Sequence, residues 1–455
     1  MIAPRPRLLL WFALLGLPSA LIPALDPSLP TGWALAGPLL IGTVAFLDAA
    51  LVVGGLKHVS LRMAPVTRCS RDRAAALALE IRSEAAAVRR VRVGLSLPAS
   101  LRSFQEELWV HPPSDGIWGR VDWGFEPKER GQFHIKRARL GMRSRLGLWD
   151  HWISQPVEGE IRSYPHLALD KRPLAALFLN RGSLGLHAQR QVGQGREFEK
   201  LREYVPGDSY DEIHWKATAK RGQPVTKVFQ LERTQEVYVF IDASRLSSRT
   251  VPRLGDPRKS GAESACEEPL LDRYLTAGLV LGQAAEHQGD LFGLGVFSDR
   301  VQTFIRAGSG SAHAHVCRDA LYRLQCQSVS PDFDELGSFI RARLRRRALL
   351  LYLTSLDDPI HAETFLRHAK LLSRQHLMVV MMARPHGVAP LFSGDVPATS
   401  DGVYEKLGAH LRWQSLQEHG RQLEKLGVAF QLVEPGSLGL ELVTRYMRVK
   451  NRQML

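Results

Sequence analysis

Two long apolar stretches near the N-terminus limit what this chain can fold into. Residues 8–25 carry no charge, and in residues 33–56 the one charged residue is Asp48. Each stretch is long enough to cross the roughly 30 Å of hydrocarbon in a bilayer. Because only the short turn 26–32 separates them, the pattern predicts a transmembrane helical hairpin within residues 1–56. A cleaved signal peptide is the alternative for the first stretch.

Basic residues flank this hairpin. Arg5 and Arg7 precede it, the turn contains no Lys or Arg, and a further set follows the second stretch: Lys57, Arg62, Arg68, Arg71 and Arg73. Because cationic residues tend to stay in the cytoplasm, both termini and the large domains are predicted to be cytoplasmic. The net charge of +14 favours contact with an anionic surface. An anionic inner leaflet satisfies that preference, which leaves a nucleic-acid-binding module as a minor alternative.

Asp48 lies toward the cytoplasmic end of the second apolar stretch. A carboxylate there is costly unless it is protonated or has a partner. Two interpretations are open: a contact with another helix or subunit, or a local polar contact near the membrane interface.

The alternation of apolar and polar residues divides the next part of the chain. Residues 57–165 offer short alternating runs between turn residues, which predict a β-sandwich of the immunoglobulin-like type. Its tryptophans are expected to pack in the core, with an exposed aromatic platform as the alternative. They are Trp109, Trp118, Trp123, Trp149 and Trp152. Residues 166–234 form a connector followed by a densely charged segment.

From residue 235 to residue 455 the periodicity changes. Apolar strands are predicted at 237–241, 291–297, 301–305, 348–353, 377–382 and 428–432. Helices are predicted between and after them at 270–288, 312–324, 333–346, 361–374, 404–426 and 438–448. Strands that are apolar on both faces and alternate with helices indicate an α/β domain with a mainly parallel sheet covered on both sides.

The segment from Gly195 to Ser244 combines charged and aromatic residues and ends in a buried strand. A dozen of its positions carry a resemblance: Glu197, Phe198, Leu201, Arg202, Tyr204, Pro206, Gly207, Asp208, Ile213, Trp215, Lys216 and Ala219. In order and spacing they resemble the signature of the bacterial family called domain of unknown function 58. That resemblance implies two helices in the bacterial inner (plasma) membrane, a β-sandwich and a von Willebrand factor type A-like domain. It also implies a MoxR-type AAA+ ATPase as partner, in the assembly or maturation of other complexes.

Asp242 ends the first strand of the α/β region, at the edge where open α/β sheets bind ligands. The resemblance implies a metal-ion-dependent adhesion site there, with an Asp-x-Ser-x-Ser motif that Asp242 and Ser244 match and a later acid that Asp357 matches. Leu246 replaces the second serine, and Ser247 would substitute for it only if the loop shifted by one residue. One interpretation is a degenerate site for Mg²⁺ or another divalent cation. The other is an aspartate that only caps nearby backbone.

Catalytic motifs are missing from the sequence, including Gly-x-Ser-x-Gly, Walker-type and His-Glu-x-x-His patterns. His313 and Cys317 share a helical face but have no evident third ligand for zinc. The arginines within 341–347 are expected to end a helix, and residues 247–269 to form a surface loop. We therefore expect a non-enzymatic, membrane-anchored cytoplasmic scaffold or adaptor that binds protein partners. A metal-dependent enzyme and a nucleic-acid-binding module are the alternatives.

Overall fold

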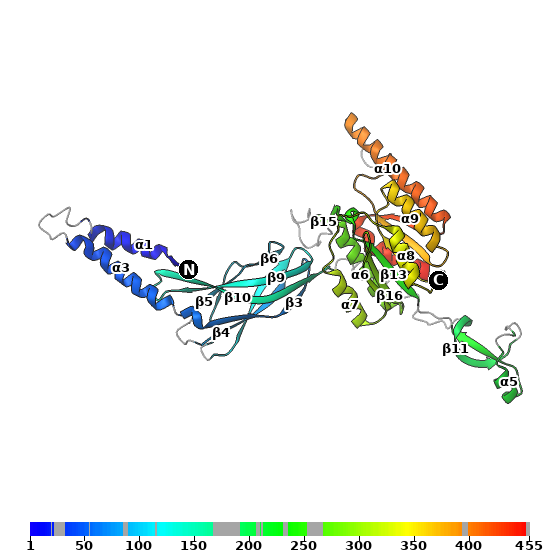
Figure 1. The fold of residues 1–455 in the computed structure, drawn as a ribbon, viewed down its shortest axis with the longest axis horizontal. Helices are drawn as coiled ribbons and strands as arrows, with labels where there is room; N and C mark the ends of the chain where they lie inside the picture. Colours follow the sequence, from blue (N-terminus) through cyan, green and yellow to red (C-terminus); the bar gives the residue numbers. More distant parts are fainter. Residues whose placement is uncertain are drawn as a thin grey trace. The chain divides into compact units, whose positions relative to one another are not determined.

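The chain divides into two compact units, Met1–His166 and Leu167–Leu455 (Figure 1). The computed structural model describes residues 1–19, 21, 32–53, 55–84, 90–113, 116–166, 192–205, 210, 213–230, 235–252, 267–393 and 399–451. Most of the loop predicted at 247–269 and much of the connector lie outside the described residues. The signature residues Pro206, Gly207 and Asp208 also lie outside them.

Two sheets face one core in the first unit. The six-stranded sheet has the order β1-β10-β9-β5-β7 with β3 beside β10, and the four-stranded sheet has the order β2-β4-β8-β6. Alternate residues of both sheets point inward, so Leu79, Trp123 and Leu140 share the same buried cluster. The immunoglobulin-like type of this arrangement stays a prediction. The strands are β1 (Ile2–Pro4), β2 (Val59–Met63), β3 (Val66–Ser70), β4 (Ala75–Ser83), β5 (Val91–Leu95), β6 (Leu101–Ser103), β7 (Leu108–Val110), β8 (Gly119–Pro127), β9 (Gly131–Arg143) and β10 (Trp149–Tyr164).

The tryptophans of this unit serve different purposes. Trp123 is fully buried in the shared core, as expected. Trp109, Trp118 and Trp152 instead each stack with an arginine guanidinium, at 4.3 to 5.1 Å from ring centroid to guanidinium carbon. The expectation of core packing was wrong for these three residues, because their rings support charged side chains.

The N-terminus begins in the first unit's larger sheet, which the sequence pattern did not anticipate. Strand β1 pairs antiparallel with β10, and the Met1 amino group donates to the Trp152 carbonyl at 2.8 Å. The chain then enters α1 (Pro6–Trp11), a π-helical turn at Phe12–Gly16 and, after residues outside the described part, α3 (Gly32–Val53). Within the described part, Gly37–His58 is the one helical stretch long and apolar enough to cross a membrane, and Pro6–Ser19 is a shorter apolar helix.

Asp48 makes a local polar contact with the sandwich. Its Oδ1 accepts a hydrogen bond at 3.1 Å from the backbone N–H of Leu146, in the turn between β9 and β10. Beside it, the indole Nε1 of Trp149 donates to the carbonyl of Ala45 in α3 at 2.8 Å. The interpretation of Asp48 as a local polar contact therefore describes its surroundings, since the side chain is buried against its own chain.

The second unit contains a six-stranded sheet with the order β17-β16-β13-β18-β19-β20. All neighbours pair parallel except β16 and β17, which form an antiparallel hairpin at one edge. The sheet agrees with the predicted mainly parallel arrangement. Its strands are β13 (Glu236–Asp242), β16 (Leu291–Phe297), β17 (Val301–Gly308), β18 (Leu349–Leu353), β19 (Leu377–Ala383) and β20 (Ala429–Val433).

Helices cover both faces of this sheet (Figure 1). One buried cluster joins the sheet to α6 (Leu270–His287), α7 (Ser311–Leu321) and α11 (Leu438–Asn451). The other joins it to α8 (Phe333–Arg343), α9 (Pro359–Leu372) and α10 (Ser400–Lys425). On this second face Gly293 and Gly295 leave room for large rings, because a Cβ there would lie 2.3 Å from Tyr238 and 2.5 Å from Phe240.

The helix predicted at 333–346 ends earlier in the structure. Helix α8 ends at Arg343, and Leu344 adopts extended backbone angles. Arg341 and Arg343 lie in its last turn, as expected, whereas Arg345, Arg346 and Arg347 belong to the connection that leads into β18. The buried Leu344 explains the early stop, since extending the chain there turns this side chain into the core.

The charged signature segment folds as a hairpin with a short helix. Strand β11 (Val192–Glu203) pairs antiparallel with β12 (Val225–Gln230), and α5 (Trp215–Arg221) lies between them in the chain. His214 caps α5, because its Nδ1 accepts from the backbone N–H of Ala217 at 3.0 Å. Tyr210 and Trp215 of this segment are exposed, so part of the signature lies on the surface.

Candidate functional site

Asp242 lies at the carboxyl end of β13 and is completely buried. Its Oδ1 accepts a hydrogen bond from the backbone N–H of Ser244 at 2.8 Å, and its Oδ2 accepts one from Thr354 Oγ1 at 2.7 Å. Thr354 follows the neighbouring parallel strand β18. The carboxylate therefore joins the ends of two adjacent strands, and Thr354 was not among the predicted site residues.

Burial raises the pKa of the Asp242 carboxyl above its ordinary value. The hydrogen bonds from Ser244 and Thr354 and the nearby His361 oppose that shift. A buried carboxylate is tolerated only where donors replace its lost hydration, and the two donors here satisfy one lone pair on each oxygen.

Ser244 starts a tight turn that sets the rest of the motif. Its Oγ accepts from the backbone N–H of Leu246 at 3.3 Å, which begins a 3₁₀ helix over Arg245–Ser248. Leu246, at the motif's third position, is buried and therefore contributes packing where the family motif has a hydroxyl. Ser247 is also fully buried, and its Oγ has no hydrogen-bond partner among the described residues.

Asp357 follows the same strand as Thr354 and forms an ion pair with Arg249. The distance from its Oδ2 to Arg249 Nη1 is 2.5 Å, and both side chains are partly exposed. Its Oδ1 is buried without a hydrogen-bond partner in the described part of the chain. Arg249 comes from the segment just after the 3₁₀ helix, so the pair links the β13 loop to the β18 loop.

Tyr274 of α6 extends this network to a third strand. Its hydroxyl donates to the carbonyl of Thr354 at 3.3 Å and accepts from the backbone N–H of Ala383, the last residue of β19, at 3.4 Å. Burial raises the pKa of this phenol well above its usual range. The ends of β13, β18 and β19 are thus held together by uncharged donors around one carboxylate.

The three predicted metal-site residues do not form a cage for a hard cation in this arrangement. Asp242 and Ser244 are adjacent, but each already accepts hydrogen bonds from the protein, and Asp357 is paired with Arg249. No group of three His, Cys, Asp or Glu side chains suited to a metal occurs among the described residues. Because Mg²⁺ requires near-octahedral oxygen ligation, these residues as placed do not fit it.

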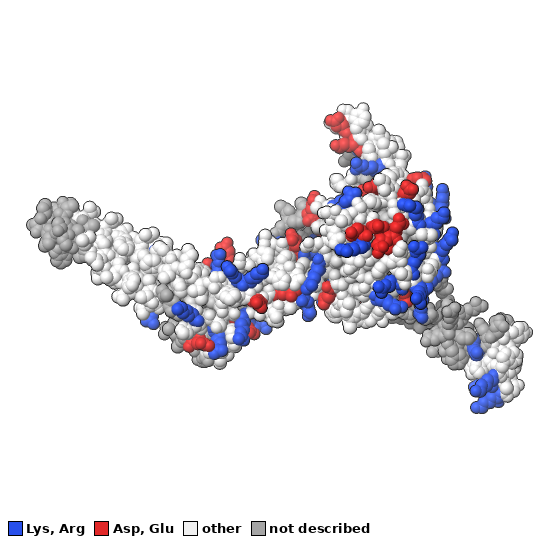
Figure 2. Space-filling view, in the orientation of Figure 1, with Lys and Arg blue, Asp and Glu red and all other residues white. Residues whose placement is uncertain are grey.

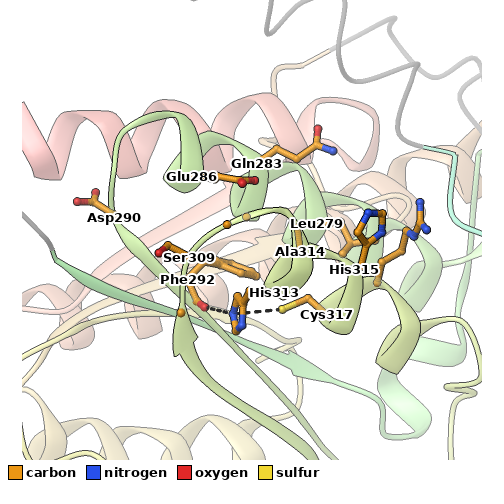
Figure 3. Close-up of a pocket in the computed structure, with 14 residues that line it drawn as sticks. Leu279, Gln283, Glu286, Asp290, Phe292, Ser309, His313, Ala314, His315 and Cys317 are labelled. Atoms are coloured by element: carbon orange, nitrogen blue, oxygen red, sulfur yellow. Dashed lines mark hydrogen bonds between the residues drawn. The ribbon is translucent and has the colours of Figure 1, made fainter.

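Away from Asp242, a hollow lies between α6 and α7 (Figure 3). It is a cavity of about 120 Å³. His313 Nε2 lies 2.7 Å from the carbonyl of Phe292 and 3.6 Å from Cys317 Sγ, while His315 points away from them. Burial raises the pKa of the Cys317 thiol to about 11, so it is a poor nucleophile and metal ligand. His313 and Cys317 share one face of the helix, as predicted, and contact each other there.

The first half of α10 extends past the carboxyl edge of the sheet (Figure 1). The helix has 26 residues and is thus about 39 Å long, whereas strands of five to seven residues span about 16–23 Å. Its buried residues, Leu416, Gly420 and Leu423, all lie in the second half. Exposed apolar side chains occupy the first half: Val403, Tyr404, Leu407 and Leu411.

Comparison with known proteins confirms the resemblance found in the sequence. Residues 200–389 match the model of a family described as protein of unknown function DUF58. This range contains the end of β11, the rest of the signature hairpin and the α/β sheet from β13 through β19, while the start of β11 precedes it. No curated protein matches the chain.

Several solved structures are similar to about half of the chain. One is the conserved hypothetical protein BatB from Bacteroides thetaiotaomicron, with 12% identity and a TM-score of 0.31, covering 48% of this chain and 99% of that one. Another is an aerotolerance-related membrane protein from Bacteroides fragilis NCTC 9343, with 15% identity, a TM-score of 0.29 and coverage of 47% and 99%. The SpRpn10 VWA domain has 9% identity, a TM-score of 0.27 and coverage of 47% and 95%. At these TM-scores the likenesses carry no argument about function.

Proposed function

Because residues 200–389 match the DUF58 family model, we propose that the protein is a membrane-anchored, non-enzymatic cytoplasmic scaffold. Its α/β domain binds a protein partner at the carboxyl edge of the sheet. By family resemblance, the partner is a MoxR-type AAA+ ATPase, and the pair serves the assembly or maturation of other complexes.

The exposed apolar stripe on α10 is the observation that carries this proposal. Tyr404 is 73% exposed and Leu411 is 57% exposed, and their spacing puts them with Leu407 on one side of the helix. Apolar side chains gathered on one exposed face mark a contact site for another protein. The segment before α10 adds Phe392, whose side chain is 98% exposed.

The network around Asp242 suits such a docking edge because it ties the ends of neighbouring strands, and the described residues that follow them, to one another. The loop after β13 and the loop after β18 are joined by the Asp242–Thr354 hydrogen bond and by the Arg249–Asp357 ion pair. The loop after β19 leads to α10 and is tied to the same network through Ala383 and Tyr274. A partner therefore meets a preformed surface and loses less conformational entropy on binding.

Anchoring in the membrane is supported by the flanking charges and by β1. Pairing of β1 with β10 holds the chain's first residues on the sandwich, so the two ends of the predicted hairpin leave from the same side. The basic residues at those ends favour the cytoplasmic side. The large units then share the cytoplasm with an ATP-dependent partner.

A crosslinking experiment in native membranes tests the partner. We would place a photoreactive phenylalanine analogue at position 404 of the full chain and identify the MoxR-type ATPase in the adduct by mass spectrometry. The expected result is a specific adduct that is lost in Leu407→Ser/Leu411→Ser. The matched control is Val316→Ser/Leu371→Ser, which removes two equally exposed apolar side chains from α7 and α9 and should leave the adduct unchanged. Recovery of no ATPase with the wild-type chain would remove the partner assignment.

A further inference from the structure

A row of aromatic and basic side chains crosses the outer face of the first unit's larger sheet. Trp109 on β7 pairs with Arg92 on β5, Arg92 pairs with Gly141 on β9, and Gly141 pairs with Trp152 on β10. The Arg92 guanidinium carbon lies 5.1 Å from the Trp109 centroid and 4.5 Å from that of Trp152. Gly141 makes this possible, because a Cβ there would lie 2.7 Å from the Trp152 ring.

More guanidinium groups surround the same tryptophan. Arg90 lies 4.3 Å and Arg143 lies 4.8 Å from the Trp109 centroid, and both side chains are exposed. We call Arg90, Arg92, Arg143, Trp109 and Trp152 the arginine–tryptophan patch. Stacking on an indole fixes an arginine's plane without using its N–H donors, so Arg90 and Arg143 can still donate to an anion. Arg92 instead donates to Glu107 and pairs with Asp150.

The patch has more positive than negative charge. Asp150 lies 2.8 Å from Arg92 and 3.6 Å from Arg5, and Glu107 lies 3.4 Å from Arg92. Among the described residues, no carboxylate lies within ion-pair distance of Arg90 or Arg143. Partial desolvation of its guanidinium and the neighbouring charges of Arg5 and Arg92 lower the pKa of Arg143, which reflects this crowding of cations.

The patch adjoins the point where the chain enters its apolar helices. Arg5 immediately precedes α1, and Asp150, its ion-pair partner, also pairs with Arg92 of the patch. The turn that follows Arg143 is fastened to α3 by the Asp48–Leu146 hydrogen bond. Leu146 itself is 56% exposed at the tip of this turn. In Figure 2 most of the surface along α1 and α3 is white, and charged residues are more frequent over the strands. α1 itself carries the exposed Arg7.

We propose that the arginine–tryptophan patch binds the phosphate of an anionic phospholipid headgroup in the leaflet that the helical hairpin enters. The inference rests on the membrane anchoring in the proposed function. Guanidinium groups bind phosphate oxygens through paired hydrogen bonds, and tryptophans settle at the headgroup level of membranes. A free phosphate would meet the same donors, but only a lipid also explains the exposed Leu146 and the position of the patch beside apolar helices.

Lipid retention by the full chain tests this proposal. The chain would be purified in detergent, exchanged into nanodiscs of mixed phosphatidylglycerol and phosphatidylcholine, and analysed for bound lipid by native mass spectrometry. Arg90→Gln/Arg143→Gln is expected to reduce the phosphatidylglycerol preference by about thirtyfold, the loss expected for two arginines at an anionic membrane surface. Lys136→Gln/Arg137→Gln removes the same charge farther along β9 and should leave the preference unchanged.

Additional arms separate the possible outcomes. Inorganic phosphate should not displace the lipid, and displacement at millimolar concentration would show a free-anion site instead. An unchanged lipid preference in Arg90→Gln/Arg143→Gln, with circular dichroism like that of the wild type, would overturn the proposal. Recovery of an acidic protein at the patch, with no lipid preference, would overturn it too. Carbonate extraction of wild-type membranes distinguishes two negative results. Release of the protein would show that it is not anchored, which would contradict the proposed function as well, whereas retention would confine the failure to the patch.

Discussion

Thr354 donates a hydrogen bond at 2.7 Å to the buried carboxylate of Asp242 from the end of the neighbouring strand. The contact joins two residues 112 positions apart in the chain. It also gives the aspartate a role that needs no ligand, since the carboxylate fixes the loops at the carboxyl edge of the sheet.

Replacing Asp242 by asparagine is expected to leave the fold stable. The folded pKa of Asp242 is raised, so its contribution to stability is fully present below the ordinary value of 3.8 and is lost as pH rises through the folded pKa. Asp242→Asn should therefore equal or exceed the wild type in free energy of unfolding at pH 7, with the advantage shrinking toward pH 4. Urea denaturation at both pH values measures it. A loss above about 2 kcal/mol at pH 7 would show that the negative charge itself is required.

Removing the Thr354 hydroxyl should destabilise the same edge. In Thr354→Val the Oδ2 of Asp242 loses its donor while side-chain shape is nearly retained, so we expect a loss of about 1–3 kcal/mol in the free energy of unfolding. Thr354→Ser keeps the hydroxyl and serves as the control, with a smaller loss from the missing methyl group. Equal losses in the two variants would mean that packing, and not the hydrogen bond, is what matters.

Divalent cations should have little effect on this domain. Arg249 already supplies a positive charge to Asp357, and Asp242 is satisfied by protein donors. Thermal unfolding of the full chain is expected to give the same midpoint in Mg²⁺ as in EDTA. Isothermal titration with Mg²⁺ and Mn²⁺ should give no binding heat. A midpoint that rises with Mg²⁺ and loses that response in Asp357→Asn would restore the predicted metal site.

His368 should make the α/β domain sensitive to acid. It is buried with its Nε2 3.0 Å from the Tyr352 hydroxyl, and burial lowers its pKa from 6.5 to about 4. The resulting stability is present above the unfolded value of 6.5 and is lost as pH falls through the folded value, a change of about 3 kcal/mol. His368→Phe should flatten this part of the stability profile measured by denaturation between pH 7 and pH 4.

The Tyr352 hydroxyl needs its own control in that experiment, because His368→Phe removes its partner. Tyr352→Phe/His368→Phe leaves no hydroxyl without a partner. Its stability should depend on pH as weakly as that of His368→Phe, and its free energy of unfolding at pH 7 should be higher than that of His368→Phe. If the slope of Tyr352→Phe alone is also flat, the acid sensitivity does not come from the histidine.

Membrane topology provides a further prediction. Since β1 belongs to the same sheet as β10, the N-terminus and the sandwich must share one side of the membrane. A green fluorescent protein fused to the C-terminus should fluoresce, and an alkaline phosphatase fusion at the same place should be inactive. An active phosphatase fusion would place the large units outside the cytoplasm.

Local sequence patterns predicted much of the α/β domain. Strands and helices beyond residue 235 lie within a few residues of the predicted ranges because their apolar residues repeat with clear periods. The strand order depends on long-range pairing, which the periodicity does not contain. Asp242 was predicted to lie at the edge, but its donor Thr354 belongs to another strand end, and Arg249 could be paired with Asp357 only once both loops were placed.

Contacts of the N-terminal unit were harder to predict. Three residues, Ile2–Pro4, are too short a stretch to show strand periodicity, so β1 was missed. Tryptophan is a residue type that usually packs in a core, so the sequence favoured burial for Trp109 and Trp152. Only the register across β7, β5, β9 and β10 shows that both stack on Arg92. A hydrophobic residue type predicts burial but not which face of a sheet it occupies.

The place of β1 also sets the order in which this protein can be made. Its partner residues on β10 reach as far as His151, so the strand can pair only after that part of the chain has been synthesised. The larger sheet is therefore completed only after the apolar helices α1 and α3, which lie between β1 and β10 in the chain, have been made. A soluble version made by deleting the first 56 residues would lose a strand together with its anchor.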